Sequence, residues 1–525
     1  MLVQRYAHAC LHTPGNAKEA SQLIQPRTTE CVVEFPWELH KRDCAVNHRR
    51  PMFSLSSMIA LLLLPLLRVQ SFEMYDPVPA SGINYSTYNT VLQRLYDRAI
   101  RLEFSNNTHV FYSPDPPLPE PFRVVVEGGS YLGAWPETQP MAGAMMAPRD
   151  VRLALDNQLI FTRTQRSDGR IANVVFCGQV HSCHAKTCLP NGTLPPTNNG
   201  IPLLQGFYMA SPMVDLSWYL NLSRPELARR YLGEVSTALT AFDAYLWNTR
   251  NDSTCFGLIN GSINASSCPP VPSTNNRRGL LWSLGAGDAG EDGSAKYRNN
   301  TLPIQSMDMM AYSHDNRRSL ARIARLLGNR SAERHWAEAA ETVVNRTSRN
   351  LWRETLGAMF DRDVDDLWVT TLTHTNLRMM WHGMFTQRQA DVFVGRHLMN
   401  RSEFFTNMPL TTVSIQDPRC IVKTGSAWTC APEGLTLQRS VRALESYGHV
   451  AELTLVGRAL FRALQIGCED NITVGCRFPT AIDPFTAAPH RGDSYGNRTP
   501  HSPPALTLAT QSHTLALTLT MGGGL

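Results

Sequence analysis

Three acidic side chains stand in one glycine-rich stretch in the middle of the chain. The stretch covers residues 282–297, WSLGAGDAGEDGSAKY, and its acids are Asp288, Glu291 and Asp292. Glycines let a backbone approach a ligand closely, and a carboxylic acid in a partly closed site can have a raised pKa and donate a proton. A glycosidic oxygen leaves poorly until it is protonated, so these residues could cleave a sugar linkage. A solvated surface turn has the same composition and is the alternative.

Two other segments combine side chains that suit sugar recognition. A tryptophan offers a flat face to a sugar ring, and carboxylate, amide and guanidinium groups hydrogen-bond its hydroxyls. Structural roles compete with this one: a tryptophan plug, or a helix cap with a surface salt bridge worth under about 1 kcal/mol. The predicted substrate-binding residues are Trp135, Glu137 and Gln139 of the loop GAWPETQP, then Arg149, Asp150, Trp282, Asp288, Glu291 and Trp428.

Hydrolysis of a glycosidic bond requires a second carboxylate, and two late segments offer one. Glu433 follows Trp428 just before a predicted helix, and Asp483 lies in the turn AIDPFT. An inverting enzyme holds its two carboxyl groups about 6.5–9.5 Å apart, a distance that sequence spacing does not give. Both residues therefore remain candidates for the general base.

No residue pattern predicts a metal site. Residues 361–366, DRDVDD, begin like a calcium loop but lack its glycine at the sixth position and its glutamate at the twelfth, so we expect a solvated turn. Four ligands in clean spacing are also absent around residues 177–188, where we predict a disulfide and a free thiol among Cys177, Cys183 and Cys188. Close pairs predict local disulfides: Cys255 with Cys268, Cys420 with Cys430, and Cys468 with Cys476.

The elements that must position these residues are mainly helices. Apolar residues at helical spacing predict helices at residues 88–104, 149–164, 205–220, 225–247, 304–327, 332–352, 374–384, 387–399, 435–447 and 450–464. Strand patterns are short, at residues 122–126 and 171–177. The helices follow in consecutive pairs joined by loops that contain the acids and aromatics, which is typical of an all-α (α/α) toroid. A helical solenoid is the alternative, but no fixed-period repeat supports it.

An apolar run predicts entry into the secretory pathway. Residues 52–71 follow Arg49 and Arg50 and match a signal peptide, since the run is short for a membrane span; an uncleaved anchor is the alternative. We expect no stable membrane insertion and an extracellular or lumenal protein. Glycosylation sequons support this and all follow the run: Asn84, Asn106, Asn191, Asn221, Asn251, Asn260, Asn264, Asn299, Asn329, Asn345, Asn400, Asn471 and Asn497.

Chain length and net charge limit the possible domain organisation and the possible binding partners. The 525 residues can hold one large helical domain, and the net charge of +5 comes without a long basic run, so no nucleic-acid partner is implied. We predict a gene-model extension or disordered segment (1–51) before a true start at Met52. A signal peptide (52–71), a lead with one helix (72–119), the helical domain (120–496) and a divergent low-complexity tail (497–525) follow.

Several motifs in collinear order resemble a known enzyme family. They are GAWPETQP, RDVRLALDNQ, QRSDGR, AGEDGS, SMDMMAYSHDNRRSLARIARLLG, NMPLTTVSIQDPR and EGLTLQRSVRALESYGH. Over about residues 120–496 the chain resembles the six-hairpin (α/α)6-barrel glycosidases. Glycoside hydrolase family 63, with its processing α-glucosidases and mannosylglycerate-hydrolase type, is the nearer likeness, and the trehalases are more distant.

The resemblance implies roles for particular acids. The family's general acid is the aspartate of a loop resembling Glu-Ser-Gly-x-Asp-Asn-Ser-Pro, which makes Asp292 the candidate, with Asp288 in place of the glutamate. The family's general base lies in a segment resembling Glu-Tyr-Tyr-Asp-Pro-x-Thr-Gly. Here Thr480 stands where that glutamate would be, so Asp483 or Glu433 takes the role, the enzyme works by a different mechanism, or the protein is inactive.

Residues and resemblance together predict a secreted glycosidase that cleaves an α-linked glucoside or mannoside by inversion. It would act on a carbohydrate substrate and need no organic cofactor and no metal. A catalytically inactive carbohydrate-binding or scaffold protein on the same barrel is the alternative, favoured by Thr480. Release of sugar from α-glycosides would separate the two.

Overall fold

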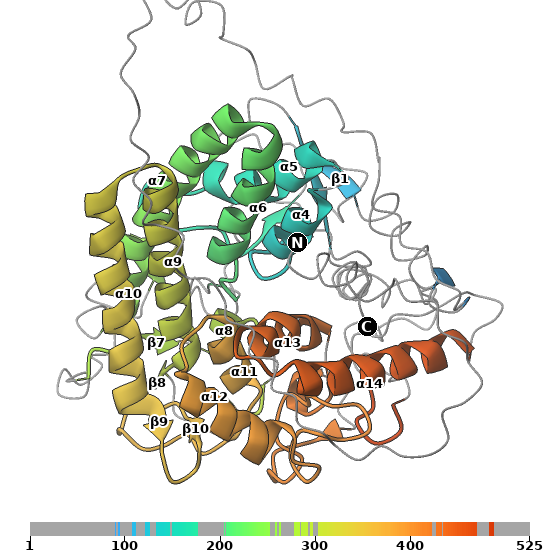
Figure 1. The fold of residues 1–525 in the computed structure, drawn as a ribbon. Coiled ribbons are helices and arrows are strands. Elements are labelled where there is room, and N and C mark those ends of the chain that lie inside the picture. The colour runs from blue at the N-terminus through green and yellow to red at the C-terminus, as the bar shows by residue number, and fades with distance from the viewer. Residues whose placement is uncertain are drawn as a thin grey trace, which may run out of the picture. The chain divides into compact units, whose positions relative to one another are not determined.

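Helices dominate the part of the chain that the structure describes (Figure 1). The computed structural model describes residues 90, 93–94, 108–111, 121–126, 133–147, 150–176, 204, 206–251, 258–259, 262–263, 278–283, 285–291, 294–297, 303–422, 427–432, 434–469 and 482–487. Most of the predicted helix at 88–104, the apolar run at 52–71, the segment 1–51 and the tail 497–525 lie outside these residues.

The helices come in the predicted order. They are α4 (Gln139–Met146), α5 (Val151–Arg163), α6 (Ala210–Ser223), α7 (Pro225–Arg250), α8 (Ala286–Ala289), α9 (Met307–Leu326), α10 (Arg330–Leu351), α11 (Thr375–Trp381), α12 (Gln387–Phe393), the π-helix η3 (Val394–Leu398), the 3-10 helix η5 (Ala427–Thr429), α13 (Gly434–Ser446) and α14 (Val450–Glu469).

From α9 to α11, a helix with one buried stripe lies between two mostly buried helices in the sequence. α9 is buried over most of its length, whereas α10 buries only a stripe at Ala340, Val343, Thr347 and Leu351. A helix that is buried on most sides belongs to the core, and one with a single apolar stripe covers the core. α9 contacts α6, α7 and α11 as well as α10, and α9 and α10 run side by side in Figure 1. Every residue of α11 is buried. This alternation is the arrangement that the paired helical pattern predicts.

Local chemistry explains where predicted and observed helices differ. The helix predicted from residue 205 begins only at Ala210, because Gly206 has a φ of +67°, outside the helical region. α4 was not predicted: its segment reads as loop, and Pro140 in the first turn, where a missing N–H costs nothing, starts it. The helix predicted over 387–399 is one continuous run in which α12 passes into η3.

The strands are short and antiparallel. They are β1 (Thr108–Phe111) with β2 (Phe122–Val125), β3 (Gly133–Ala134) with β4 (Val175–Phe176), β5 (Leu258–Ile259) with β6 (Ser262–Ile263), β7 (Trp282–Ser283) with β8 (Ile304–Gln305), and β9 (Trp352–Arg353) with β10 (Ala358–Met359). Thr108 pairs with Val125 and Phe111 with Phe122. The pairing of β7 with β8 brings together the two ends of residues 284–303, which contain the three acids of the glycine-rich stretch.

One of the predicted disulfides lies within the described residues. The structure places Cys420 and Cys430 in disulfide geometry, with Cα atoms 4.8 Å apart, while the other predicted pairs and the cysteines at 177–188 include residues outside the described ranges.

Among the helices that are described, none combines the length and hydropathy that a bilayer span requires.

A buried histidine in α9 predicts a dependence of stability on pH. Burial, with help from Arg318 and His382, lowers the pKa of His314 from 6.5 to about 3. The unfolded chain therefore binds this proton more readily than the folded protein, so stability is lost as pH falls from 6.5 toward 3, by at most about 1.4 kcal/mol per pH unit. Denaturant unfolding between pH 7 and pH 4 should show a shallower fall for His314→Gln than for the wild type. Equal slopes would contradict the prediction.

Candidate functional site

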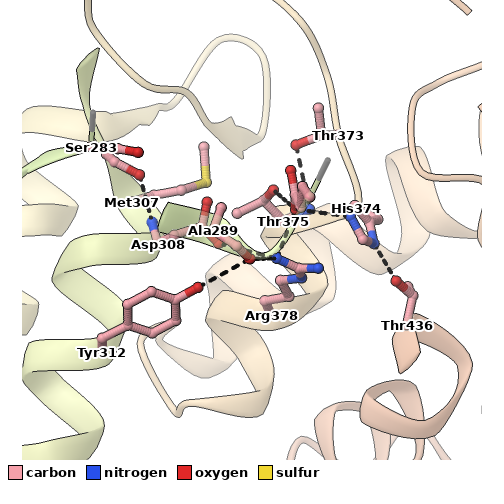
Figure 2. Close-up of polar contacts among 12 residues, drawn as sticks. Ser283, Ala289, Met307, Asp308, Tyr312, Thr373, His374, Thr375, Arg378 and Thr436 are labelled. Atoms are coloured by element: carbon pink, nitrogen blue, oxygen red, sulfur yellow. Dashed lines mark hydrogen bonds and ion pairs between the residues drawn. The ribbon is translucent and has the colours of Figure 1, made fainter. Parts of the chain in front are cut away.

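A buried ion pair joins the acidic glycine-rich stretch to α11. Arg378 Nη1 lies 2.7 Å from Glu291 Oε1, and the two side chains are 1% and 0% exposed. The same nitrogen donates to the carbonyl oxygen of Ala289 at 3.0 Å, and the Tyr312 hydroxyl donates to that oxygen at 3.3 Å (Figure 2). Both ends of the Ala289–Glu291 segment are thereby fixed to α9 and α11.

A histidine extends the contact to α13. His374 Nε2 lies 3.1 Å from Glu291 Oε1, and its Nδ1 lies 2.5 Å from Thr436 Oγ1 (Figure 2). The ring also lies 5.9 Å from the ring of Trp428, which belongs to η5. His374 therefore links Glu291 to α13 and to η5.

A buried lysine fixes the other end of the stretch. Lys296, 1% exposed, donates to Asp308 and lies 3.3 Å from Asp361 Oδ2. It also donates to Thr375 Oγ1 at 3.4 Å, and that hydroxyl donates to Glu291 Oε1 at 3.3 Å. We call Glu291, Lys296, Asp308, His374, Thr375 and Arg378 the Arg378 cluster.

Asp361 corrects one prediction. The acidic run at 361–366 was expected to be a solvated turn, but Asp361 is 2% exposed and accepts a hydrogen bond from the backbone N–H of Met307 at 2.7 Å. Its neighbour Asp363 is partly exposed and Asp365 is exposed, as expected. The sequence does not show which acid of such a run is buried, because burial depends on where a cation from a distant segment lies.

Charge compensation decides the protonation of the cluster. Burial alone would raise the pKa of Glu291, but Arg378, Lys296 and His374 hold it well below its usual range. Burial would lower the pKa of Lys296, but Asp308 and Asp361 hold it well above its usual range. Glu291 is therefore a carboxylate and Lys296 an ammonium ion, so the cluster is a charged network and neither group is a proton donor near neutral pH.

A second buried arginine ties the GAWPETQP segment to the same region. The Arg439 guanidinium of α13 stacks on the ring of Tyr208, with its carbon 3.7 Å from the ring centre. Arg439 Nη2 lies 3.8 Å from Glu137 Oε1. A side chain at Gly290 would approach the Glu137 carboxylate to 2.7 Å, and the φ of Gly290 is +66°. Glycine is thus required where the two predicted sugar-binding segments meet.

Three other predicted binding residues have structural partners. Asp288 is fully buried and pairs with Arg250 of α7 at 3.1 Å. Asp150 caps α5 by accepting from the Leu153 N–H and pairs with Arg123 at 3.0 Å, which is the cap and salt-bridge alternative. Gln139, 0% exposed, accepts from the backbone N–H of Trp135. Their sugar-binding roles stay predictions.

The three tryptophans differ in exposure. Trp282 in β7 is 0% exposed and presents no face to solvent, whereas Trp135 and Trp428 are partly exposed. Trp428 also lies beside the Arg378 guanidinium, 5.4 Å from ring centre to carbon. Trp428 therefore has the surroundings that best suit contact with a sugar ring.

Of the candidate catalytic acids, the structure describes only Asp483. Asp292 and Glu433 lie outside the described residues, as does Arg149, a predicted substrate-binding residue. Asp483 Oδ1 accepts from the N–H groups of Phe485 and Thr486 at 2.9 and 2.8 Å and so holds its own turn. The N–H of Ile482 donates to the carbonyl of Pro432, so the segments that continue into Asp483 and Glu433 are neighbours.

Several buried residues in and near the Arg378 cluster were not predicted as functional: Tyr208, Lys296, Asp308, His374, Thr375, Arg378 and Arg439. One signal was present for Arg378, which stands among apolar residues in TNLRMMW. A lone charge in an apolar helix marks a buried ion pair, because a charge is buried at great cost unless it is paired. In the described ranges no group of three or more histidine, cysteine, aspartate or glutamate side chains could hold a metal ion.

Known proteins share the sequence pattern and the fold of this chain. A sequence model described as the mannosylglycerate hydrolase MGH1-like glycoside hydrolase domain matches residues 134–495. The family 63 mannosylglycerate hydrolase of Thermus thermophilus, solved with Tris, has a TM-score of 0.58 at 15% identity, covering 81% of this chain and 100% of the other. The neutral trehalase of Saccharomyces cerevisiae has a TM-score of 0.54 at 12% identity, covering 79% and 76%. No curated protein sequence matched. The all-α (α/α)6 fold class is confirmed.

Proposed function

Because the chain belongs to the mannosylglycerate hydrolase MGH1-like glycoside hydrolase family, we propose that it hydrolyses an α-linked glucoside or mannoside with inversion at the anomeric carbon. The observation that supports this most is the Arg378 cluster. It ties Glu291, the residue covalently joined to Asp292, to α9, α11 and α13. The Thermus thermophilus relative was also solved in complex with glucose, which agrees with a hexose substrate.

The proposed reaction uses two carboxyl groups. Asp292, protonated, gives its proton to the glycosidic oxygen as the bond from that oxygen to the anomeric carbon breaks. A carboxylate on the opposite face, Glu433 or Asp483, takes a proton from a water molecule whose oxygen attacks the same carbon. The products are the free sugar, with inverted configuration, and the alcohol. Because Asp483 Oδ1 already holds a turn, Glu433 is our first choice for the base.

Secretion, glycosylation and the disulfides belong to the same proposal. The Cys420–Cys430 geometry suits an oxidising compartment. Asn221, Asn329 and Asn345 are exposed, as an attached glycan requires. Mass spectrometry of the mature protein from a eukaryotic host should find glycans at these positions.

The reaction is tested by incubating the protein with a panel of α-glucosides, α-mannosides and α-linked disaccharides. We expect release of one sugar, and ¹H NMR in the first minutes should show the β-anomer before mutarotation, since inversion of an α-linkage yields it. First appearance of the α-anomer would contradict inversion. Saturable binding without any product would favour the inactive carbohydrate-binding alternative.

A further inference from the structure

The acidic stretch is held on both sides by buried side chains that face away from solvent. Glu291 immediately precedes Asp292, and Lys296 follows four residues later. Both are at most 1% exposed, so neither is placed to touch a sugar. Their partners Arg378, Thr375, Asp308 and Asp361 come from other segments. The stretch is therefore tied to the barrel at two points.

One hydroxyl connects the two ties. Thr375 Oγ1 accepts from Lys296 Nζ at 3.4 Å and donates to Glu291 Oε1 at 3.3 Å. An ammonium group only donates and a carboxylate only accepts, so the hydroxyl hydrogen has one favourable direction. The result is a chain from ammonium through hydroxyl to carboxylate, with every hydrogen in a defined place. Such a chain fixes position more tightly than either ion pair alone.

The ties rest on rigid elements. Thr375 and Arg378 belong to the fully buried α11, and Asp308 belongs to the first turn of α9. Asp308 Oδ1 also lies 3.7 Å from Arg378 Nη1, so the partner of Lys296 contacts the partner of Glu291. Side chains on helices that other groups hold in place position a site more accurately than side chains on free loops.

We propose that Glu291, Thr375 and Lys296 form a clamp that positions the proton donor of the proposed reaction, on which this inference rests. The clamp residues act through the backbone between them and do not contact substrate. Proton transfer requires a hydrogen-bond distance of about 2.6–3.2 Å, and a misplacement near 1 Å costs about 100-fold in rate. A loosened clamp should therefore slow the step that needs the acid.

Leaving-group dependence distinguishes lost positioning from general damage. An alkyl glycoside needs a proton on its departing oxygen, whereas a 2,4-dinitrophenyl glycoside leaves without one. We expect Thr375→Val and Glu291→Gln to lower kcat/KM for the alkyl glycoside at least about 10-fold more than for the dinitrophenyl glycoside. Thr375→Val is the milder change, since it removes only the bridging hydroxyl.

Two reference variants complete the design. Asp292→Asn should show the same leaving-group signature more strongly. Thr164→Val removes a buried hydroxyl that donates to Ile160 O in α5, away from the stretch, and should lower both rates equally if at all. An unchanged ratio in both clamp variants, with Asp292→Asn still showing the signature, would overturn the clamp and leave the proposed function intact. A wild type that hydrolyses neither substrate would overturn both.

Discussion

Asp292→Asn should lower kcat for an alkyl α-glycoside by about 10²- to 10⁴-fold, the usual contribution of a general acid. Asparagine has nearly the same shape as aspartate but no proton of suitable acidity, so the leaving oxygen would depart as an alkoxide. The change should leave the thermal unfolding midpoint close to the wild-type value. Initial rates and thermal unfolding on the same preparation measure both quantities.

Substrate choice makes this result specific. The loss should shrink on a 2,4-dinitrophenyl glycoside, because that leaving group needs little protonation. Glu433→Gln and Asp483→Asn should instead lose activity on both substrates if they remove the base, because water activation is required in each case. Wild-type turnover by Asp292→Asn on the alkyl glycoside would remove the assignment of the acid.

Arg378→Met should lower the free energy of unfolding by about 3–5 kcal/mol, the usual cost of removing one partner from a buried ion pair. Arg378 is 1% exposed, and its removal would leave the Glu291 carboxylate in the core without its closest cation. It would also remove the hydrogen bond to Ala289 O. Methionine keeps most of the side-chain volume, so the loss reports charge and hydrogen bonding more than a cavity. Denaturant or thermal unfolding measures it.

Two comparisons isolate the cause. Arg388→Met removes an exposed partner of Glu354 and should leave the unfolding transition unchanged, because exposed ion pairs contribute little. Adding Glu291→Gln to Arg378→Met should cost less than the sum of the two single changes, since the unpaired charge disappears with its partner. Additive losses would mean that the pair is not the source of the stability.

The helices were largely predictable from sequence, and for a local reason. A helix forms when nearby residues share the 3.6-residue spacing, with caps such as Asn329, whose side chain accepts from the Ala332 N–H at the start of α10. Departures from prediction have equally local causes, such as the positive φ of Gly206 before α6. The collinear order of the motifs is likewise a property of the chain alone, and it is enough to indicate the family.

The sequence indicated which segments form the site, but not which of their side chains contact one another. Glu291 was singled out as a sugar-binding acid, but it is buried and bound to Arg378, which is far away in the sequence. Asp361 was expected in solvent and lies beside Lys296. Nothing in either local pattern states which distant charge will be its partner.

By itself, the sequence determined the helical order and the family, and the role of Asp292 as general acid stays a prediction from the family motif. Only the tertiary structure decided which charges are buried together, and so which acids are anchors held by cations. The physical reason is the separation along the chain over which each interaction acts. Helical periodicity and capping act between residues within one turn, whereas the pairing of Glu291 with Arg378 exists only once the segment that ends at Glu291 lies against α11 and water is excluded.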